Sequence, residues 1–265
     1  MNRIVRTVGR ALARYLNQPI RRYQPYAVVN PAVLAAVLQP ADILLVDGNT
    51  RISTAIKYLT QSTWSHAAMF VGDALKGDDI NHEFPTLVEA DVESGVIAVH
   101  LKKYAAFNTR ICRPVGLTAE DQHRIVDFMI KRIGHAYDLK NVVDLARYLL
   151  PTPPVPVTWR RRMIAFGSGD PTRAVCSTLI AQAFQSVHYP ILPRIERQRV
   201  LATDKLHYTE KEILHIRHYS LFTPRDFDVS PYFRVVKPTI EAGFNYQNLA
   251  WHDEDRPQNP NVNTT

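Results

Sequence analysis

The chain has 265 residues, of which 46% are hydrophobic and 22% charged, a composition typical of a globular protein with one large domain or two small ones. No apolar run approaches the ~20 residues of a membrane-spanning helix, which argues against an integral membrane protein. The two cysteines, Cys112 and Cys176, are too few for a disulfide framework. We therefore expect a cytoplasmic protein with free thiols.

The formal net charge of +7 is concentrated at the N-terminal end of the sequence. Six arginines come before the first acidic residue, Asp42, and they are Arg3, Arg6, Arg10, Arg14, Arg21 and Arg22. Subtracting these six from the 32 Lys and Arg residues leaves 26 basic against 25 acidic residues, so the remaining sequence is nearly neutral. A nucleic-acid-binding domain usually carries its basic excess on the folded surface, so we expect no nucleic-acid partner.

We interpret residues 1–39 as a basic amphipathic arm. On a helix, four of its arginines fall on one narrow face and its apolar side chains fall on the opposite face. These residues are Arg3, Arg6, Arg10 and Arg14 on one side and Ile4, Val8, Leu12, Tyr15 and Leu16 on the other. Residues 1–22 fit a helix that lies on an anionic membrane surface, which would make the protein peripheral at the membrane. They fit a helix packed on the domain equally well, and a mitochondrial presequence is a third interpretation.

Residues 40–240 read as one domain of mixed strands and helices, and residues 241–265 as a polar tail. Apolar runs that end at turn residues predict buried strands over 41–48, 65–73 and 108–115. Residues 86–101 predict two further strands with a turn between them.

Helices are predicted between and after these strands. Residues 53–61 predict a short helix, and a longer one runs from its cap at Thr118 to Gly134. Its apolar face consists of Ile125, Phe128, Met129 and Ile133. Residues 137–150 predict another helix, residues 151–159 and 167–173 predict loops, and the sequence after them predicts a helix that begins near Cys176.

Cys176 is the candidate nucleophile because it opens an apolar-faced helix. The positive end of the helix dipole and the free N–H groups of the first turn favour a thiolate there, and the same N–H groups can hold an oxyanion. A buried structural cysteine can occupy the same position, so this placement alone leaves both interpretations open. Cys112 lies in a strand-like stretch with no evident base, and we expect it to be inert.

A catalytic thiol needs a base and an orienting group, and the predicted strands supply candidates for both. His66 opens the strand 65–73, and Glu89 lies on what should be the neighbouring strand. A carboxylate there can hold the second ring nitrogen of the histidine and fix its tautomer. Each residue also has a structural interpretation, as a packed strand histidine or a surface glutamate. A zinc site formed by His66, Glu89 and Cys176 is a less favoured alternative, since the sequence contains no pair of metal ligands at a typical spacing.

The order of these motifs resembles the circularly permuted papain-like hydrolases of the NlpC superfamily, and within it the YiiX/YebB-like group. The resemblance covers about residues 40 to 235 and rests on "PADILLVDG", "WSHAAMFVGD", "LVEA", "GHAYD", "VCSTLIAQAF" and "TPRDFDVSPYF". It implies an α+β fold in which an antiparallel sheet packs against the helix that bears the cysteine. It also implies Cys176 as nucleophile, His66 as base and Glu89 as orienting acid. Tyr137, in "GHAYD", would line the site, assist the oxyanion hole or simply pack.

The resemblance implies a cysteine hydrolase that cleaves an amide bond, peptide-like or N-acyl, through a thioester acyl-enzyme. The expected partner is therefore a peptide or an acylated small molecule, and no cofactor or metal is expected. Two alternatives remain open: a lipid acyltransferase or phospholipase built on the same permuted scaffold, and a catalytically inactive membrane-associated binding module.

Overall fold

The computed structural model describes residues 15, 17–20, 23–76, 85–91, 94–135, 175–201 and 208–248. Several predictions fall outside these residues: the helix over 137–150, the loops over 151–159 and 167–173, most of the basic segment 1–22, and the end of the tail.

The described part of the chain is built around one six-stranded sheet with the strand order β4-β3-β2-β1-β5-β8. Every neighbouring pair in it is antiparallel. The strands are β1 (Ile43–Val46), β2 (His66–Phe70), β3 (Leu87–Asp91), β4 (Gly95–Val99), β5 (Thr109–Pro114) and β8 (Phe233–Val236). The first five are the strands that the apolar runs predict, and the antiparallel sheet with packed helices confirms the predicted α+β class.

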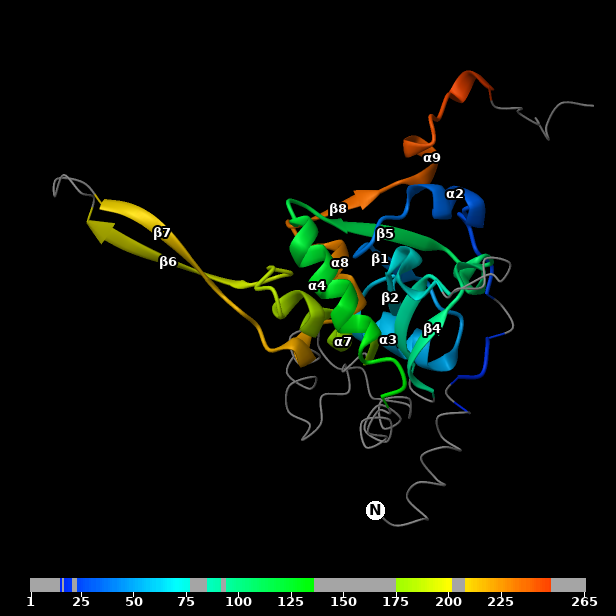
Figure 1. Ribbon diagram of the computed structural model, residues 1–265, viewed down its shortest axis with the longest axis horizontal. Coiled ribbons are helices and arrows are strands. Elements are labelled where there is room, and N and C mark those ends of the chain that lie inside the picture. Colours follow the sequence, from blue (N-terminus) through cyan, green and yellow to red (C-terminus); the bar gives the residue numbers. More distant parts are fainter. Residues whose placement is uncertain are drawn as a thin grey trace, which may run out of the picture.

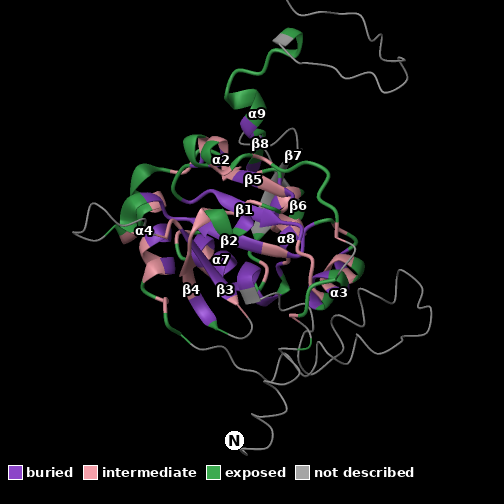
Figure 2. Cartoon of the chain, turned by 90° about the vertical axis from the view of Figure 1, so that its right-hand side faces the viewer, coloured by how far each residue is buried: buried purple, intermediate pink, exposed green. Residues whose placement is uncertain are grey.

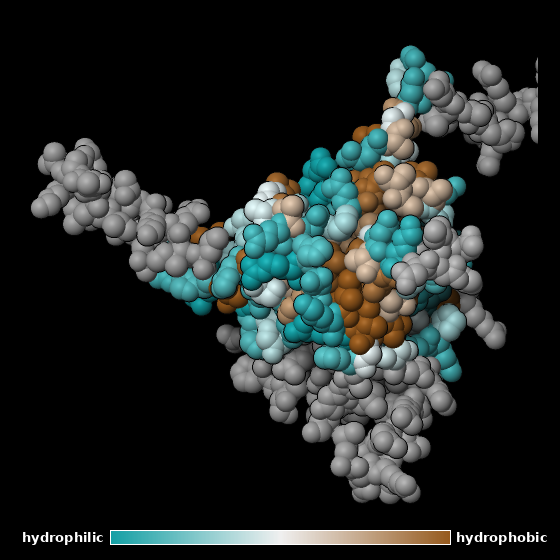
Figure 3. Space-filling model, viewed as in Figure 1, coloured by the Kyte–Doolittle hydropathy of each residue, from teal (hydrophilic) through white to brown (hydrophobic). Residues whose placement is uncertain are grey.

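Two helices cover one face of this sheet, α4 (Ala119–Ile130) and α7 (Val175–Gln185), and α7 contacts β2 and β3 (Figure 1). Four of their side chains, Ile125, Met129, Ile180 and Phe184, are completely buried. Burial of each such side chain contributes about 1.5 to 3 kcal/mol to folding. Buried residues accordingly gather on the central strands and α7 (Figure 2), whereas the outward side of α4 is hydrophilic (Figure 3).

Helix α4 begins as the sequence predicts but ends earlier. The Thr118 hydroxyl accepts a hydrogen bond from the Asp121 N–H at 3.1 Å, which caps the helix. The helix stops at Ile130 instead of continuing to Gly134, because the last turn tightens. The Ile133 N–H donates to the Ile130 carbonyl at 3.0 Å, and Gly134, with a φ of +87°, reverses the chain.

The opposite face of the sheet is covered by α2 (Pro31–Val37) and by the 3-10 helix η2 (Leu101–Tyr104). Leu34 of α2 is 1% exposed and packs in one cluster with Leu44 and Ala68. Part of the segment 1–39 therefore packs on the sheet. The domain limits at residues 40 and 240 stay a prediction.

The remaining elements lie at the periphery. They are α3 (Arg51–Thr60), η1 (Gly72–Leu75), β6 (Arg194–Leu201), β7 (Tyr208–His215), η3 (Tyr219–Leu221), α8 (Pro224–Asp228), α9 (Pro238–Glu241) and η4 (Tyr246–Asn248). Strands β6 and β7 form a separate two-stranded hairpin that projects from the body (Figure 1). None of the helices among the described residues is long and apolar enough to cross a membrane.

Candidate active site

His66 is the first residue of β2, so its ring lies at the end of the sheet. Its backbone pairs with Val46 on one side, and Ala68 pairs with Glu89 on the other. Side chains alternate along a strand, so His66, Ala68 and Glu89 share one face of the sheet. The diagonal between neighbouring strands is short enough for long side chains to meet. His66 Nε2 lies 3.1 Å from Glu89 Oε2.

Glu89 is a buried carboxylate, and three of the described side chains donate to it or lie within hydrogen-bond distance of it. Besides His66, the Lys103 ammonium donates to Oε1 and the Tyr104 hydroxyl donates to Oε2. Burial alone would raise the pKa of Glu89, but the charges and hydrogen bonds of His66 and Lys103 outweigh it and lower the pKa to about 2. Glu89 is therefore ionised at neutral pH.

Cys176 is the second residue of α7 and is 4% exposed. Burial acts to lower the pKa of His66. The charges of Cys176 and Glu89, together with hydrogen bonds to both, act in the opposite direction and raise this pKa to about 10. Because Nε2 faces Glu89, Nδ1 is the ring nitrogen left for the thiol. The His66 ring therefore lies between Cys176 and the Glu89 carboxylate, and its raised pKa favours the imidazolium.

Cys112 differs from Cys176 in its surroundings. It lies on β5, is completely buried, and burial raises the pKa of its thiol above the ordinary value. This agrees with the expectation that Cys112 is a neutral, inert thiol.

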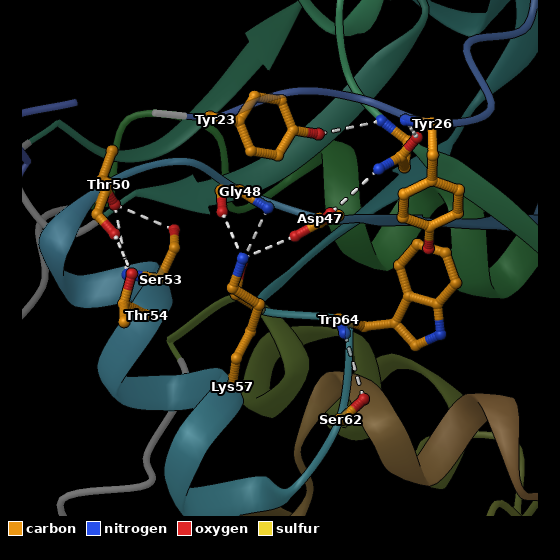
Figure 4. A network of polar contacts seen from close by, with 12 residues as sticks. Tyr23, Tyr26, Asp47, Gly48, Thr50, Ser53, Thr54, Lys57, Ser62 and Trp64 are labelled. Atoms are coloured by element: carbon orange, nitrogen blue, oxygen red, sulfur yellow. Dashed lines mark hydrogen bonds and ion pairs between the residues drawn. The ribbon is translucent and has the colours of Figure 1, made fainter. Parts of the chain in front are cut away.

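A polar network around Asp47 and Gly48 fixes the backbone beside His66 (Figure 4). The Lys57 ammonium donates to Asp47 Oδ1 at 2.6 Å and to the Gly48 carbonyl at 3.0 Å. The Gly48 N–H donates to the hydroxyl of Ser65, the residue before His66, at 3.0 Å. A Cβ on Gly48 would lie 2.3 Å from the Ser53 hydroxyl oxygen and 2.8 Å from that of Ser65, so a larger residue here would displace these hydroxyls.

A second anchor holds the first turn of α7. The buried Ser177 hydroxyl donates to the Phe222 carbonyl at 2.8 Å and joins α7 to η3. Cys176 is the neighbour of Ser177, so both the histidine and the cysteine are attached to backbone that hydrogen bonds hold in place. A pocket lined by Gln185, Tyr189 and Arg217, among others, lies at the other end of α7 and is not part of this site.

The structure thus brings His66, Glu89 and Cys176 together, while Tyr137 lies outside the described residues. Their catalytic roles stay a prediction. The sequence interpretation missed Lys103 and Tyr104, because nothing in the pattern of residues 100–107 indicates that they reach Glu89. Within the described ranges, no group of three or more His, Cys, Asp or Glu side chains is arranged to hold a metal ion, and this includes the three candidate residues.

A cysteine at the start of a helix, packed on an antiparallel sheet that carries a histidine and a carboxylate, is the arrangement of a papain-like thiol site. Residues 37–148 match the family model described as "Permuted papain-like amidase enzyme, YaeF/YiiX, C92 family". The match includes His66 and Glu89 and ends before Cys176. It confirms the predicted resemblance to permuted papain-like proteins of the YiiX type.

A solved structure is also similar to this chain, the crystal structure of metalloprotein yiiX (DUF1105) from Escherichia coli O157:H7. The two share 18% sequence identity with a TM-score of 0.43, and the similarity covers 75% of this chain and 96% of that one. The comparison with curated proteins found no match.

Proposed function

We propose that this protein is a cysteine hydrolase of amide bonds, with Cys176 as nucleophile and His66 as general base and acid. The observation that carries the proposal is the His66 ring, which has Glu89 3.1 Å from Nε2 and a hydrogen bond to Cys176. The family description of residues 37–148 as a permuted papain-like amidase supports the same reaction class.

In the proposed mechanism, the Cys176 thiolate attacks the carbonyl carbon of the amide and forms a tetrahedral oxyanion. The N–H groups of the first turn of α7 are the donors expected to stabilise this oxyanion. The His66 imidazolium then gives its proton to the leaving amine, and the C–N bond breaks to leave a thioester on Cys176. Neutral His66 next removes a proton from water, and the resulting hydroxide releases the acid and regenerates the thiolate.

The direct test is labelling with an electrophilic acyl probe followed by peptide mass spectrometry. We expect one probe per chain on Cys176, and no label after Cys176→Ala. Cys112→Ala is the matched control and should label like the wild type, because Cys112 is buried on β5. Equal labelling of both cysteines, or none in the native protein, would contradict the proposal and favour a binding module without catalysis.

A second candidate function is acyl transfer or hydrolysis on lipids, and the N-terminal sequence favours it. Four arginines lie on one face of the predicted helix, which suits attachment to an anionic membrane. The first chemical step would be the same, with an ester instead of an amide. Rates on an N-acyl amide and on a phospholipid ester, presented in anionic vesicles, distinguish the two functions. Turnover of the amide alone supports the amidase, and turnover that requires the vesicle supports the lipid enzyme.

A further inference from the structure

Besides His66, two described partners of Glu89 come from a single element, η2. The Lys103 ammonium donates to Oε1, and the Tyr104 hydroxyl donates to Oε2, the oxygen that also faces His66. We propose that Lys103 and Tyr104 are positioning residues of the Cys176 site, which act through Glu89 to hold the orientation and the charge of the His66 ring. This inference rests on the proposed function and assigns further residues to the same site.

Tyr104 fixes the carboxylate in place. Its side chain is 5% exposed and packs in the cluster that contains Ala68 and Leu87, so the hydroxyl cannot swing away. Burial, and then the negative charge of Glu89, raise the pKa of Tyr104 well above its ordinary value, so the hydroxyl remains a neutral donor. With Oε2 held by Tyr104, the acceptor for His66 Nε2 stays at one position. The ring then has one orientation toward Cys176.

Lys103 sets how strongly the negative charge of Glu89 raises the pKa of His66. Among the described residues, the charged or titratable groups that face the pair of His66 and Glu89 are Cys176 from α7, Lys103 and Tyr104 from η2, and Asp91 at the end of β3, which acts on Tyr104. A second cation beside Glu89 lowers the net negative charge that His66 experiences. Without Lys103, the full negative charge of Glu89 would act on the His66 imidazolium, which would then release its proton poorly. With the Lys103 ammonium beside Glu89, the imidazolium can still protonate a leaving amine.

The test is an NMR titration of the His66 ring in protein labelled at histidine, with His66→Gln to assign the signal. Lys103→Met should raise the His66 pKa by about 0.5 to 1 unit, because it removes a neighbouring cation. Lys103→Arg keeps the charge and should titrate like the wild type. Lys131→Met is the charge control, since Lys131 is exposed on the surface beside α4. An unchanged His66 pKa in Lys103→Met would overturn the role of Lys103.

Tyr104 is tested by the rate at which iodoacetamide alkylates Cys176 at pH 6. Tyr104→Phe removes the hydroxyl alone, and we expect the rate to fall by about 3- to 10-fold because the His66 ring loses its fixed acceptor. Tyr26→Phe is the control, since the Tyr26 side chain is 74% exposed. A lowered unfolding temperature with an unchanged alkylation rate would mean that Tyr104 is merely structural. If wild-type Cys176 is not alkylated selectively at pH 6, the proposed function fails, whereas the His66 titration still decides the role of Lys103.

Discussion

His66 Nε2 and Glu89 Oε2 lie 3.1 Å apart across two neighbouring strands, although the residue directly opposite Glu89 is Ala68. The contact therefore follows the diagonal of the β2–β3 pair, and the sheet itself sets the distance between the two side chains. A histidine and a carboxylate on such a diagonal need no loop to bring them together.

Glu89→Gln should abolish most of the activity while leaving the shape of the side chain intact. The amide carries no charge, so it no longer stabilises the imidazolium, and the His66 pKa should fall. We expect kcat on an amide substrate to drop by about 100-fold or more, within the range that general acid–base catalysis contributes. Glu241→Gln, on the exposed helix α9, is the control and should keep full activity. A loss of activity of less than threefold in Glu89→Gln would rule out an orienting role.

The pH dependence of unfolding should show the titration of Glu89. Its pKa is lowered in the folded state from 4.5 to about 2, so its contribution to stability is fully present above pH 4.5 and disappears as the pH falls toward 2. The free energy of unfolding of the wild type should therefore decrease over this window more steeply than that of Glu89→Gln. Urea denaturation at several pH values from 6 down to 2.5 measures both curves, and parallel curves would contradict the lowered pKa.

The contribution of His66 to stability should change with pH in the opposite direction, and it should be lost at alkaline pH. Its pKa is raised from 6.5 to about 10 in the folded state, so its stabilising contribution is complete below pH 6.5 and is lost as the pH rises through 10. His66→Gln should remove this dependence. The free energies of unfolding of the wild type and of His66→Gln, measured between pH 6 and pH 10.5, show this dependence. A constant difference between the two proteins over this range would count against the ion pair of His66 and Glu89.

The two cysteines should react at very different rates. Iodoacetamide at pH 6 should modify Cys176 selectively, because His66 is hydrogen-bonded to Cys176 and can accept the proton of its thiol. Cys112 should remain unmodified in the native protein and react only after unfolding, because burial raises the pKa of its thiol. Peptide mapping after alkylation measures both. The variant His66→Ala should shift the reactivity of Cys176 to higher pH, and an unchanged profile would indicate a packed thiol.

The pair of Asp42 and Arg113 should matter for stability and not for the reaction. Arg113 Nη2 donates to Asp42 Oδ2 at 2.7 Å, and Asp42 is completely buried between β1 and β5. Asp42→Ala leaves the guanidinium unpaired and should cost about 3 to 5 kcal/mol in the free energy of unfolding. Asp127→Ala, which breaks an exposed ion pair with Lys131, is the matched control and should cost less than about 1 kcal/mol.

The membrane hypothesis is best tested by a shorter truncation than the whole arm. Tyr15 and Pro19 contact the start of α3, since the Tyr15 hydroxyl accepts from Arg51 at 2.8 Å and Pro19 pairs with Thr50. Deletion of residues 1–14 removes Arg3, Arg6, Arg10 and Arg14 and spares these contacts. At ~1 kcal/mol per arginine near an anionic surface, sedimentation with anionic vesicles should be lost while turnover of a small amide is unchanged. Replacement of the four arginines by lysine should preserve binding, and retained binding after the deletion would refute the hypothesis.

The sequence is sufficient to predict the strands that carry the site. The runs at 43–46 and 66–70 are apolar and end at turn residues, so their burial and length follow from composition. The resemblance to permuted papain-like hydrolases, which rests partly on the inverted order of histidine and cysteine, then implies which residues meet. The contacts of Lys103 and Tyr104 with Glu89 could not be predicted in this way, because they depend on how the chain after β4 returns beside β3. The hairpin of β6 and β7 is likewise missing from the prediction, since its charged sequence, "RIERQRVL", has no apolar run.

The strand order has a consequence for synthesis of the protein. Strand β8 completes the sheet by pairing with β5, and it comes late in the chain, after the helix that carries Cys176. A ribosome delivers the chain from its N-terminus, so β1 to β5, with His66 and Glu89, are synthesised before Cys176. The thiol joins them only when α7 docks, and the edge of β5 stays open until residue 236 has left the exit tunnel. His66 and Cys176 therefore meet only after most of the protein has been made.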